Sequence, residues 1–140
     1  MSNINTGRVV LGGLLAGLVL NIGEVLLNDV VLGNHMKDFL ATHNFQEPGG
    51  KFIAVAVGFT FVMGIVLVAG YACIRTRLGP GVNTAIIAGL FGWFGVYFYC
   101  GIVNGVLFGF SLGTICTLLV WGLIQYVVAA IAGAWAYKEA

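Results

Sequence analysis

Four long runs of apolar residues constrain this 140-residue chain more than any other feature. They cover residues 9–32, 52–74, 84–110 and 113–137, and the second and third runs contain no charged residue. About 20 apolar residues, each rising 1.5 Å along a helix, cross the hydrocarbon layer of a membrane. The runs are longer than the strands of a membrane barrel and do not alternate in polarity, so they predict helices.

The composition excludes the common soluble classes of protein. Charged residues make up 8% of the chain and hydrophobic residues 60%, whereas about a quarter of a soluble domain is charged. The apolar content also excludes intrinsic disorder, and a net charge of +1 offers no basic patch for nucleic acid. We therefore expect a single all-α domain, a four-helix transmembrane bundle whose first partner is the lipid bilayer.

Basic residues near the ends of the runs predict the orientation of the chain. They divide into Arg8, Arg75, Arg77 and Lys138 on one side of the membrane, and Lys37 and Lys51 on the other. Because cytoplasmic loops carry the excess of Lys and Arg, this division predicts that both termini are cytoplasmic. A signal peptide competes as an interpretation of the first run, but no small-x-small cleavage site follows it, and we expect a helix of the mature protein.

The connections between the runs differ in length. The segment RTRLGPG at residues 75–81 predicts a tight turn around Pro80, and the third connection, near Phe110 and Ser111, is very short. Residues 33–50 form the longest loop, in which four residues follow helical i, i+3, i+4, i+7 spacing: Met36, Phe39, Leu40 and His43. We expect a short amphipathic helix there, capped by Asn34 and lying at the outer interface between the first two spans.

The 22 glycines need a physical reason, because glycine weakens a helix. In lipid, small residues let two helix backbones approach closely, and that contact replaces the hydrophobic drive for association. Glycines that recur along one face predict helix-packing positions at Gly13, Gly17, Gly101, Gly105, Gly122 and Gly133. The pattern leaves open whether each partner helix belongs to this chain or to another subunit.

Glu24 is the sharpest polar feature, because a carboxylate inside hydrocarbon is a functional hypothesis by default. At 100° per residue, Asn21, Glu24 and Asn28 continue the stripe that Gly13 and Gly17 begin. Residues of other helices can reach this stripe, among them Tyr97, Tyr99, Asn104 and Gln125. Two interpretations stay open: a proton or cation site facing a water-filled crevice, or an interhelical hydrogen-bond network in which Glu24 is protonated or bonded to Asn and Tyr.

Signatures of enzymes and metal sites are absent from the sequence. It contains no P-loop, dinucleotide fingerprint, HExxH or G-x-S-x-G motif, so we expect a protein that is not an enzyme. His35 and His43 lie in the outer loop without a ligand spacing, which predicts no metal site, and no cofactor is indicated. The three cysteines, Cys73, Cys100 and Cys116, lie in apolar runs and are expected to be buried thiols.

Three segments resemble a family of small, uncharacterised, four-span bacterial integral membrane proteins. They are RVVLGGLLAGLVLNIGE at residues 8–24, YACIRTRLGPGVNTAIIAGL at residues 71–90, and the VWGL…GAWAYKE ending at residues 120–139. The resemblance implies four helices in the bacterial cytoplasmic (inner) membrane. It brings no activity.

Short loops, small-residue stripes and the missing catalytic motifs favour one function. We expect a non-catalytic accessory or structural subunit that packs with other membrane subunits, or with itself as a homo-oligomer. The alternative is a small oligomeric transporter or channel component that uses Glu24 together with Asn21 and Asn28. An enzyme acting on lipid or quinone is a third and weaker hypothesis.

Overall fold

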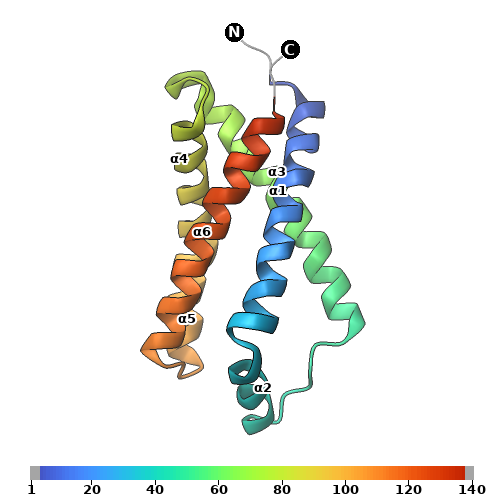
Figure 1. The fold of residues 1–140 in the computed structure, drawn as a ribbon, viewed down its shortest axis with the longest axis vertical. Coiled ribbons are helices and arrows are strands. Elements are labelled where there is room, and N and C mark those ends of the chain that lie inside the picture. Colours follow the sequence, from blue (N-terminus) through green and yellow to red (C-terminus); the bar gives the residue numbers. More distant parts are fainter. Residues whose placement is uncertain (1–3, 138–140) are drawn as a thin grey trace.

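A computed structural model describes residues 4–137 of the chain, so Lys138 and Glu139 lie outside the described residues. Four helices within this part are long and apolar enough to cross a membrane: Thr6–Val31, Gly50–Leu78, Val82–Leu107 and Leu112–Ala136. The prediction of an all-α, four-helix transmembrane bundle is confirmed, and the chain is a multi-pass membrane protein (Figure 1).

Two of the spans are not uniform α-helices. The first consists of α1 (Thr6–Val25) and the π-helical segment η1 (Leu26–Val31). The third consists of α4 (Val82–Trp93), the π-helical segment η2 (Phe94–Phe98) and α5 (Tyr99–Leu107). Apolar periodicity does not distinguish a π-helical turn from an α-helical one, so the sequence did not predict these segments. π-Helical turns occur frequently at functional sites.

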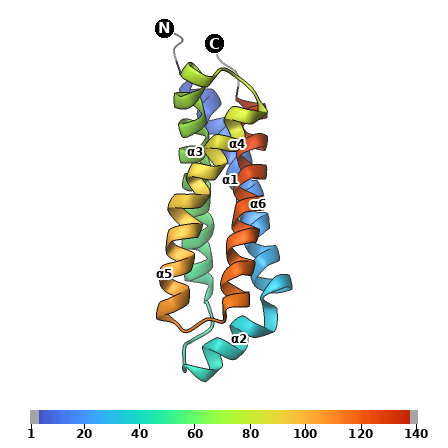
Figure 2. The same ribbon diagram turned by 90° about the vertical axis from the view of Figure 1, so that its left-hand side faces the viewer.

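The helices close into a ring around a core whose main cluster lies in one half of the bundle. α1 packs against α3 (Gly50–Leu78) and α6 (Leu112–Ala136), and α4 packs against both α3 and α6 (Figures 1 and 2). The buried core residues include Ala16, Val68, Tyr71, Ala85 and Ala129. They all belong to the half of the bundle that carries the chain termini, so the opposite half is less tightly closed.

The turn between α3 and α4 is shorter than the sequence predicted. Residues 75–78 were expected in the turn, but they are helical up to Leu78. The Arg75 guanidinium lies 5.4 Å from the ring centroid of Tyr137, which gives this last helical turn a packing partner. Gly79 and Gly81 then reverse the chain at φ values of 82° and 140°, a region that favours glycine.

The third span also ends earlier than expected, at Leu107 instead of residue 110. Residues 108–111 connect it to α6, and Gly109 has a φ of 68° in this connection. The side chain of Ser111 caps α6 by accepting a hydrogen bond from the backbone nitrogen of Thr114 at 3.1 Å.

The predicted short helix is present as α2 (Gly33–Thr42), at the end of the bundle opposite the termini (Figure 2). The expected cap at Asn34 is wrong, because η1 leads through Leu32 directly into the helix and Asn34 lies inside it. Phe39 anchors α2 to the α5–α6 connection, with ring centroids 4.9 Å from Phe110 and 6.0 Å from Phe108.

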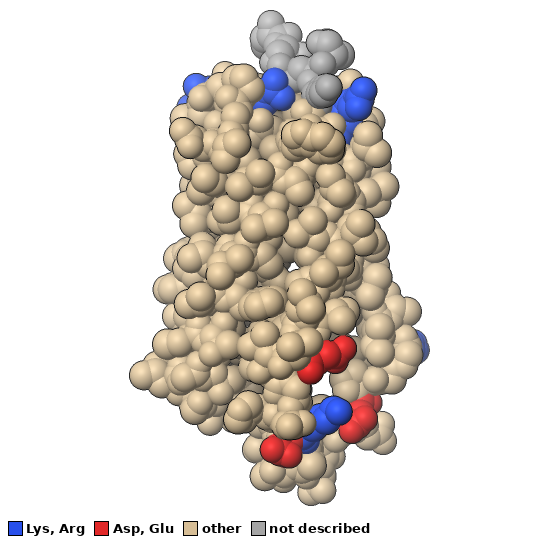
Figure 3. Space-filling view, in the orientation of Figure 1, with Lys and Arg blue, Asp and Glu red and all other residues tan. Residues whose placement is uncertain are grey.

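The distribution of charge agrees with a membrane-crossing bundle. Figure 3 shows Lys and Arg at the end that carries the termini, then a broad band without charge. Acidic and basic side chains both lie towards the end that carries α2. Many of the side chains on the surface of the uncharged band are apolar and exposed, as is normal for a surface in contact with lipid.

Candidate functional site

Glycines bring α1 and α3 into backbone contact. Gly13, Gly17 and Gly64 are buried where the two helices cross. A Cβ atom on Gly17 would lie 2.8 Å from the Cα atom of Phe61, and one on Gly64 would lie 2.6 Å from the Cα atom of Gly17. Any side chain larger than hydrogen therefore forces these two helices apart.

The other glycines singled out from the sequence also lie against neighbouring helices of this chain. A Cβ on Gly133 would lie 3.0 Å from the carbonyl oxygen of Gly12, and one on Gly105 would lie 2.7 Å from Ile115. Gly101 and Gly122 accommodate the side chains of Leu119 and Tyr97 in the same way. These stripes thus serve packing within one molecule, whatever else binds outside it.

Beyond the glycine contact, α3 leaves α1 in the half of the bundle that carries α2 (Figure 1). Residues 50–59 of α3 are exposed on every face of the helix, including the face towards α1. Gly58 has no atom within 4 Å of the position its Cβ would take. Figure 3 shows the molecule hollowed between α3 and the other helices in this half, and we call this space the α1–α3 opening.

The polar stripe of α1 lies along this opening. Gly13 and Gly17 face α3. Asn21 and Glu24 of α1 and Asn28 of η1 follow along the same span at intervals of three and four residues. Asn21 and Glu24 are half-buried, whereas Asn28 is exposed. One face of the first span is therefore covered by α3 near the termini. The same face carries polar side chains farther along, where α3 no longer covers it.

The Glu24 carboxylate accepts hydrogen bonds from two neutral side chains. The hydroxyl of Tyr97 in η2 and the Nε2 of Gln125 in α6 both donate hydrogen bonds to Glu24 Oε1, the second at 2.7 Å. Gln125 is only 5% exposed. Its Oε1 accepts a hydrogen bond from Trp121 Nε1 at 3.2 Å, and the same nitrogen lies 3.1 Å from the carbonyl oxygen of Gly23. Three spans thus meet at one carboxylate.

Local glycines make room for this network. A Cβ on Gly122 would collide with the Tyr97 ring, and one on Gly23 would collide with the Gln125 side chain. Tyr97 lies in the π-helical segment η2, whose wider turns alter the angular position of each side chain. The network therefore depends on two small residues and on one irregular helix segment.

The structure brings some of the expected site residues together and separates others. Glu24 and Gln125 meet directly. Asn21 and Asn28 bond to backbone carbonyls of their own helix, and Asn104 is exposed on α5, outside the network. Trp121 was missed, although its i, i+4 spacing from Gln125 is a signal that it can reach the same site.

The cysteines differ from the sequence expectation. Cys73, Cys100 and Cys116 are free thiols, but all three are exposed, so the prediction of buried thiols is wrong. An apolar run shows only that a residue lies within a membrane span, and the packing of the helices decides which side of the helix faces lipid. Within residues 4–137, no group of three His, Cys, Asp or Glu residues is arranged to hold a metal ion.

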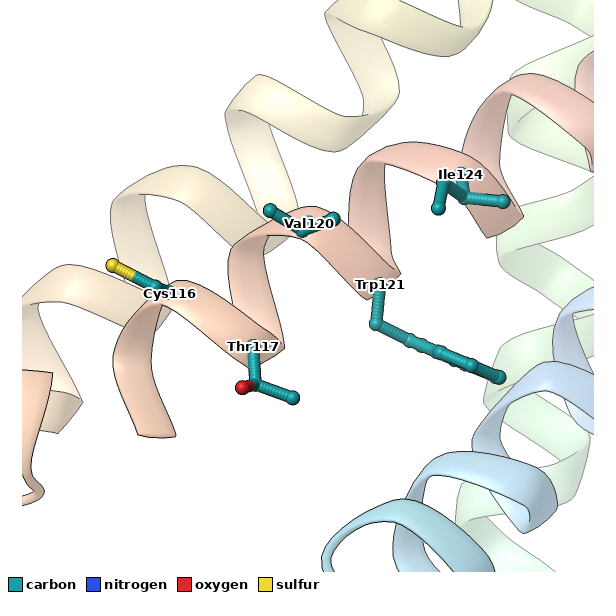
Figure 4. Close-up of a pocket in the computed structure, with 5 residues that line it drawn as sticks. All are labelled: Cys116, Thr117, Val120, Trp121 and Ile124. Carbon is teal, nitrogen blue, oxygen red and sulfur yellow. The ribbon is translucent and has the colours of Figure 1, made fainter. Parts of the chain in front are cut away.

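A shallow groove runs along α6 beside Trp121. It has a volume of about 350 Å³ and is lined by Cys116, Thr117, Val120, Trp121 and Ile124. Figure 4 shows the Trp121 indole extending from α6 towards α1, so the ring forms one wall of the groove. The groove residues are mainly apolar, and we assign the chemistry to the Glu24 network instead.

Comparison with protein-family models, curated proteins and solved structures finds no match. The class of this protein is therefore defined by its own architecture. It is a four-span membrane protein whose termini-bearing half is closed by glycine contacts. In its other half, a membrane-embedded carboxylate is bonded to a tyrosine and a glutamine.

Proposed function

We propose that the chain is a non-catalytic integral membrane subunit that packs in a larger membrane complex, with other subunits or with further copies of itself. The observation that carries the proposal is the unsupported first third of α3. Residues 50–59 are exposed on all sides, whereas Phe61, Gly64 and Ile65 of the same helix lie against the backbone of α1. A partner helix that enters the α1–α3 opening would give this segment the contact that residues 4–137 do not provide.

Glycines on the outward faces support the same proposal. Gly58 and Gly70 of α3 and Gly95 of η2 have no atom within 4 Å of a Cβ position. Each glycine weakens its helix by about 1 kcal/mol relative to alanine, and nothing inside the chain compensates for this loss. Close approach of a helix from another subunit is the compensation that small residues offer in lipid.

The location we propose is the bacterial cytoplasmic membrane, with both termini in the cytoplasm. The resemblance of three sequence segments to bacterial four-span proteins supports the first part. The excess of arginine at the termini-bearing end, from Arg8, Arg75 and Arg77, supports the second. Accessibility of single cysteines introduced into α2 to a membrane-impermeant maleimide in intact cells tests the orientation.

Assembly is tested with Gly58→Leu and the wild-type chain. Purification in mild detergent should recover wild-type protein in a complex larger than the monomer. Gly58→Leu should yield a folded monomer, because the side chain meets open space in the isolated chain. Gly64→Leu is the matched control on the same helix, and it should fail to fold because Gly64 touches the α1 backbone. A wild-type chain that is monodisperse and alone in native membranes contradicts the proposal.

The Glu24 network favours a second candidate, a small oligomeric transporter or channel component. Two donors from different helices converge on one oxygen of a carboxylate that borders the α1–α3 opening. Proton or ion flux into vesicles that contain the wild-type chain, compared with Glu24→Gln, tests this candidate. Absence of flux from both would end it.

A further inference from the structure

The hydrogen bonds along the polar stripe leave the amide oxygens without a donor. Asn21 Nδ2 donates to the carbonyl oxygen of Gly17 at 2.9 Å, and Asn28 Nδ2 donates to the carbonyl oxygen of Glu24 at 2.8 Å. Each amide nitrogen keeps a second N–H, and each amide oxygen keeps both of its acceptor positions, so the oxygens are available to bind a positively charged group. Neither asparagine uses its side-chain oxygen within the described residues.

Glu24 shows the same asymmetry. Tyr97 and Gln125 both donate to Oε1, and no donor from residues 4–137 reaches Oε2. Among residues 4–137, the Tyr137 hydroxyl is the one fully buried side-chain nitrogen or oxygen atom that has no hydrogen-bond partner. Glu24 Oε2 also has no partner, so it is not fully buried. One carboxylate oxygen is thus fixed by the bundle while the other is accessible.

We propose that Glu24 Oε2 binds a monovalent cation, which enters through the α1–α3 opening past the amide oxygens of Asn21 and Asn28. Oxygen donors suit hard cations. The side chains that bond to the carboxylate are a phenol and an amide, which carry no charge, so the ionised form of Glu24 would be the one negative charge of the site. A monovalent cation neutralises that charge, whereas a divalent cation would leave a net positive charge in an apolar surrounding.

This inference goes beyond the subunit function, and it holds whether or not the chain assembles with partners. The monovalent cation could come from two sources. One is an alkali ion in water at the membrane surface, and the other is a primary ammonium group of the kind found in lipid headgroups. Both place a single positive charge next to oxygen atoms. The experiment distinguishes them with different probes.

The test uses the full chain in uncharged detergent at constant ionic strength. Sodium, potassium or methylammonium chloride replaces N-methyl-D-glucamine chloride, whose cation is much bulkier than the other three. Trp121 fluorescence is the readout, because its indole bonds to the Gln125 amide that holds Glu24. Trp93→Phe and Trp135→Phe remove the other two tryptophans from the signal.

The expected result is a saturable change with at least one small cation. Glu24→Gln should weaken apparent affinity about tenfold or more, the scale of losing a charge-assisted contact. Asp29→Asn is the matched control, since Asp29 is an exposed acid on the same span, and it should leave the affinity unchanged. Saturation by sodium or potassium identifies an alkali ion, and saturation by methylammonium alone identifies an ammonium group.

A second variant keeps the proposal falsifiable if Glu24→Gln does not fold. Tyr97→Phe retains the carboxylate but removes one donor, so more negative charge remains to attract a cation and binding should tighten. A role limited to packing would not produce that gain. Equal responses to the small cations and to N-methyl-D-glucamine, or unchanged affinity in both variants, would overturn the proposal.

Discussion

The contact between α1 and α3 gives the sharpest test of how this bundle holds together. Gly64→Ala adds one methyl group where the structure has backbone on the opposite side. The new Cβ would lie 2.6 Å from the Cα atom of Gly17, whereas carbon atoms in ordinary contact are about 3.5–4.0 Å apart. The two helices must therefore separate by about 1 Å, and a gap of this size forfeits a quarter to a half of each dispersion contact.

The size of the effect follows from two opposing terms. Alanine in place of glycine stabilises a helix by about 1 kcal/mol, and overpacking a tight contact destabilises by about 1–3 kcal/mol. Gly58→Ala, six residues earlier in α3, gains the first term alone, because its Cβ meets no atom within 4 Å. The free energies of unfolding of the two variants should thus differ by about 1–3 kcal/mol, with Gly64→Ala the less stable.

Unfolding in mixed micelles by added sodium dodecyl sulfate, followed by tryptophan fluorescence, measures this difference. Both variants change glycine to alanine in the same helix, so helix propensity cancels in the comparison. Equal stabilities, or a greater loss in Gly58→Ala, would refute the reasoning that backbone contact at Gly64 closes the bundle.

Three further predictions concern the turn, α2 and the network. Gly79→Ala should destabilise the chain by about 1–2 kcal/mol, because its φ of 82° suits glycine, whereas Gly70→Ala in open space should not; thermal unfolding of both variants checks this. Phe39→Ala should release α2, seen as faster hydrogen exchange in that helix with unchanged spans; slow exchange would contradict the aromatic anchor. Tyr97→Phe should lower stability by about 1–3 kcal/mol by removing a donor to the carboxylate, and Tyr99→Phe, at an exposed tyrosine, should leave unfolding unaltered.

Much of the architecture could be predicted from composition and run length. Each of the four spans begins and ends within about four residues of the expected position, because the thickness of a bilayer sets the length of its helices. The errors fall at helix ends. α3 continues beyond the expected turn, where Arg75 packs on Tyr137, and Asn34 is not a cap because η1 continues directly into α2.

The candidate site was predicted only in part. Glu24 was recognisable because an acid in hydrocarbon is costly, and Gln125 because few polar residues occur in the spans. Asn104 was an equally reasonable partner by depth, yet it is exposed on α5. Depth along a helix follows from counting residues, but rotation about the helix axis depends on the π-helical segment η2 and on which helices are neighbours.

The amino-acid sequence by itself determined that this chain crosses a membrane four times as helices, since apolar runs of this length leave backbone groups no other way to be bonded in lipid. It also determined which residues are small enough for two helices to approach closely, and that Glu24 is the acid that needs hydrogen-bond partners inside the membrane. Only the tertiary structure decided that α1 and α3 touch near the termini and part towards α2, and that Tyr97 and Gln125 hold one oxygen of Glu24 while leaving the other accessible. Contacts between spans far apart in the chain depend on crossing angle and rotation, and no local pattern of residues specifies either quantity.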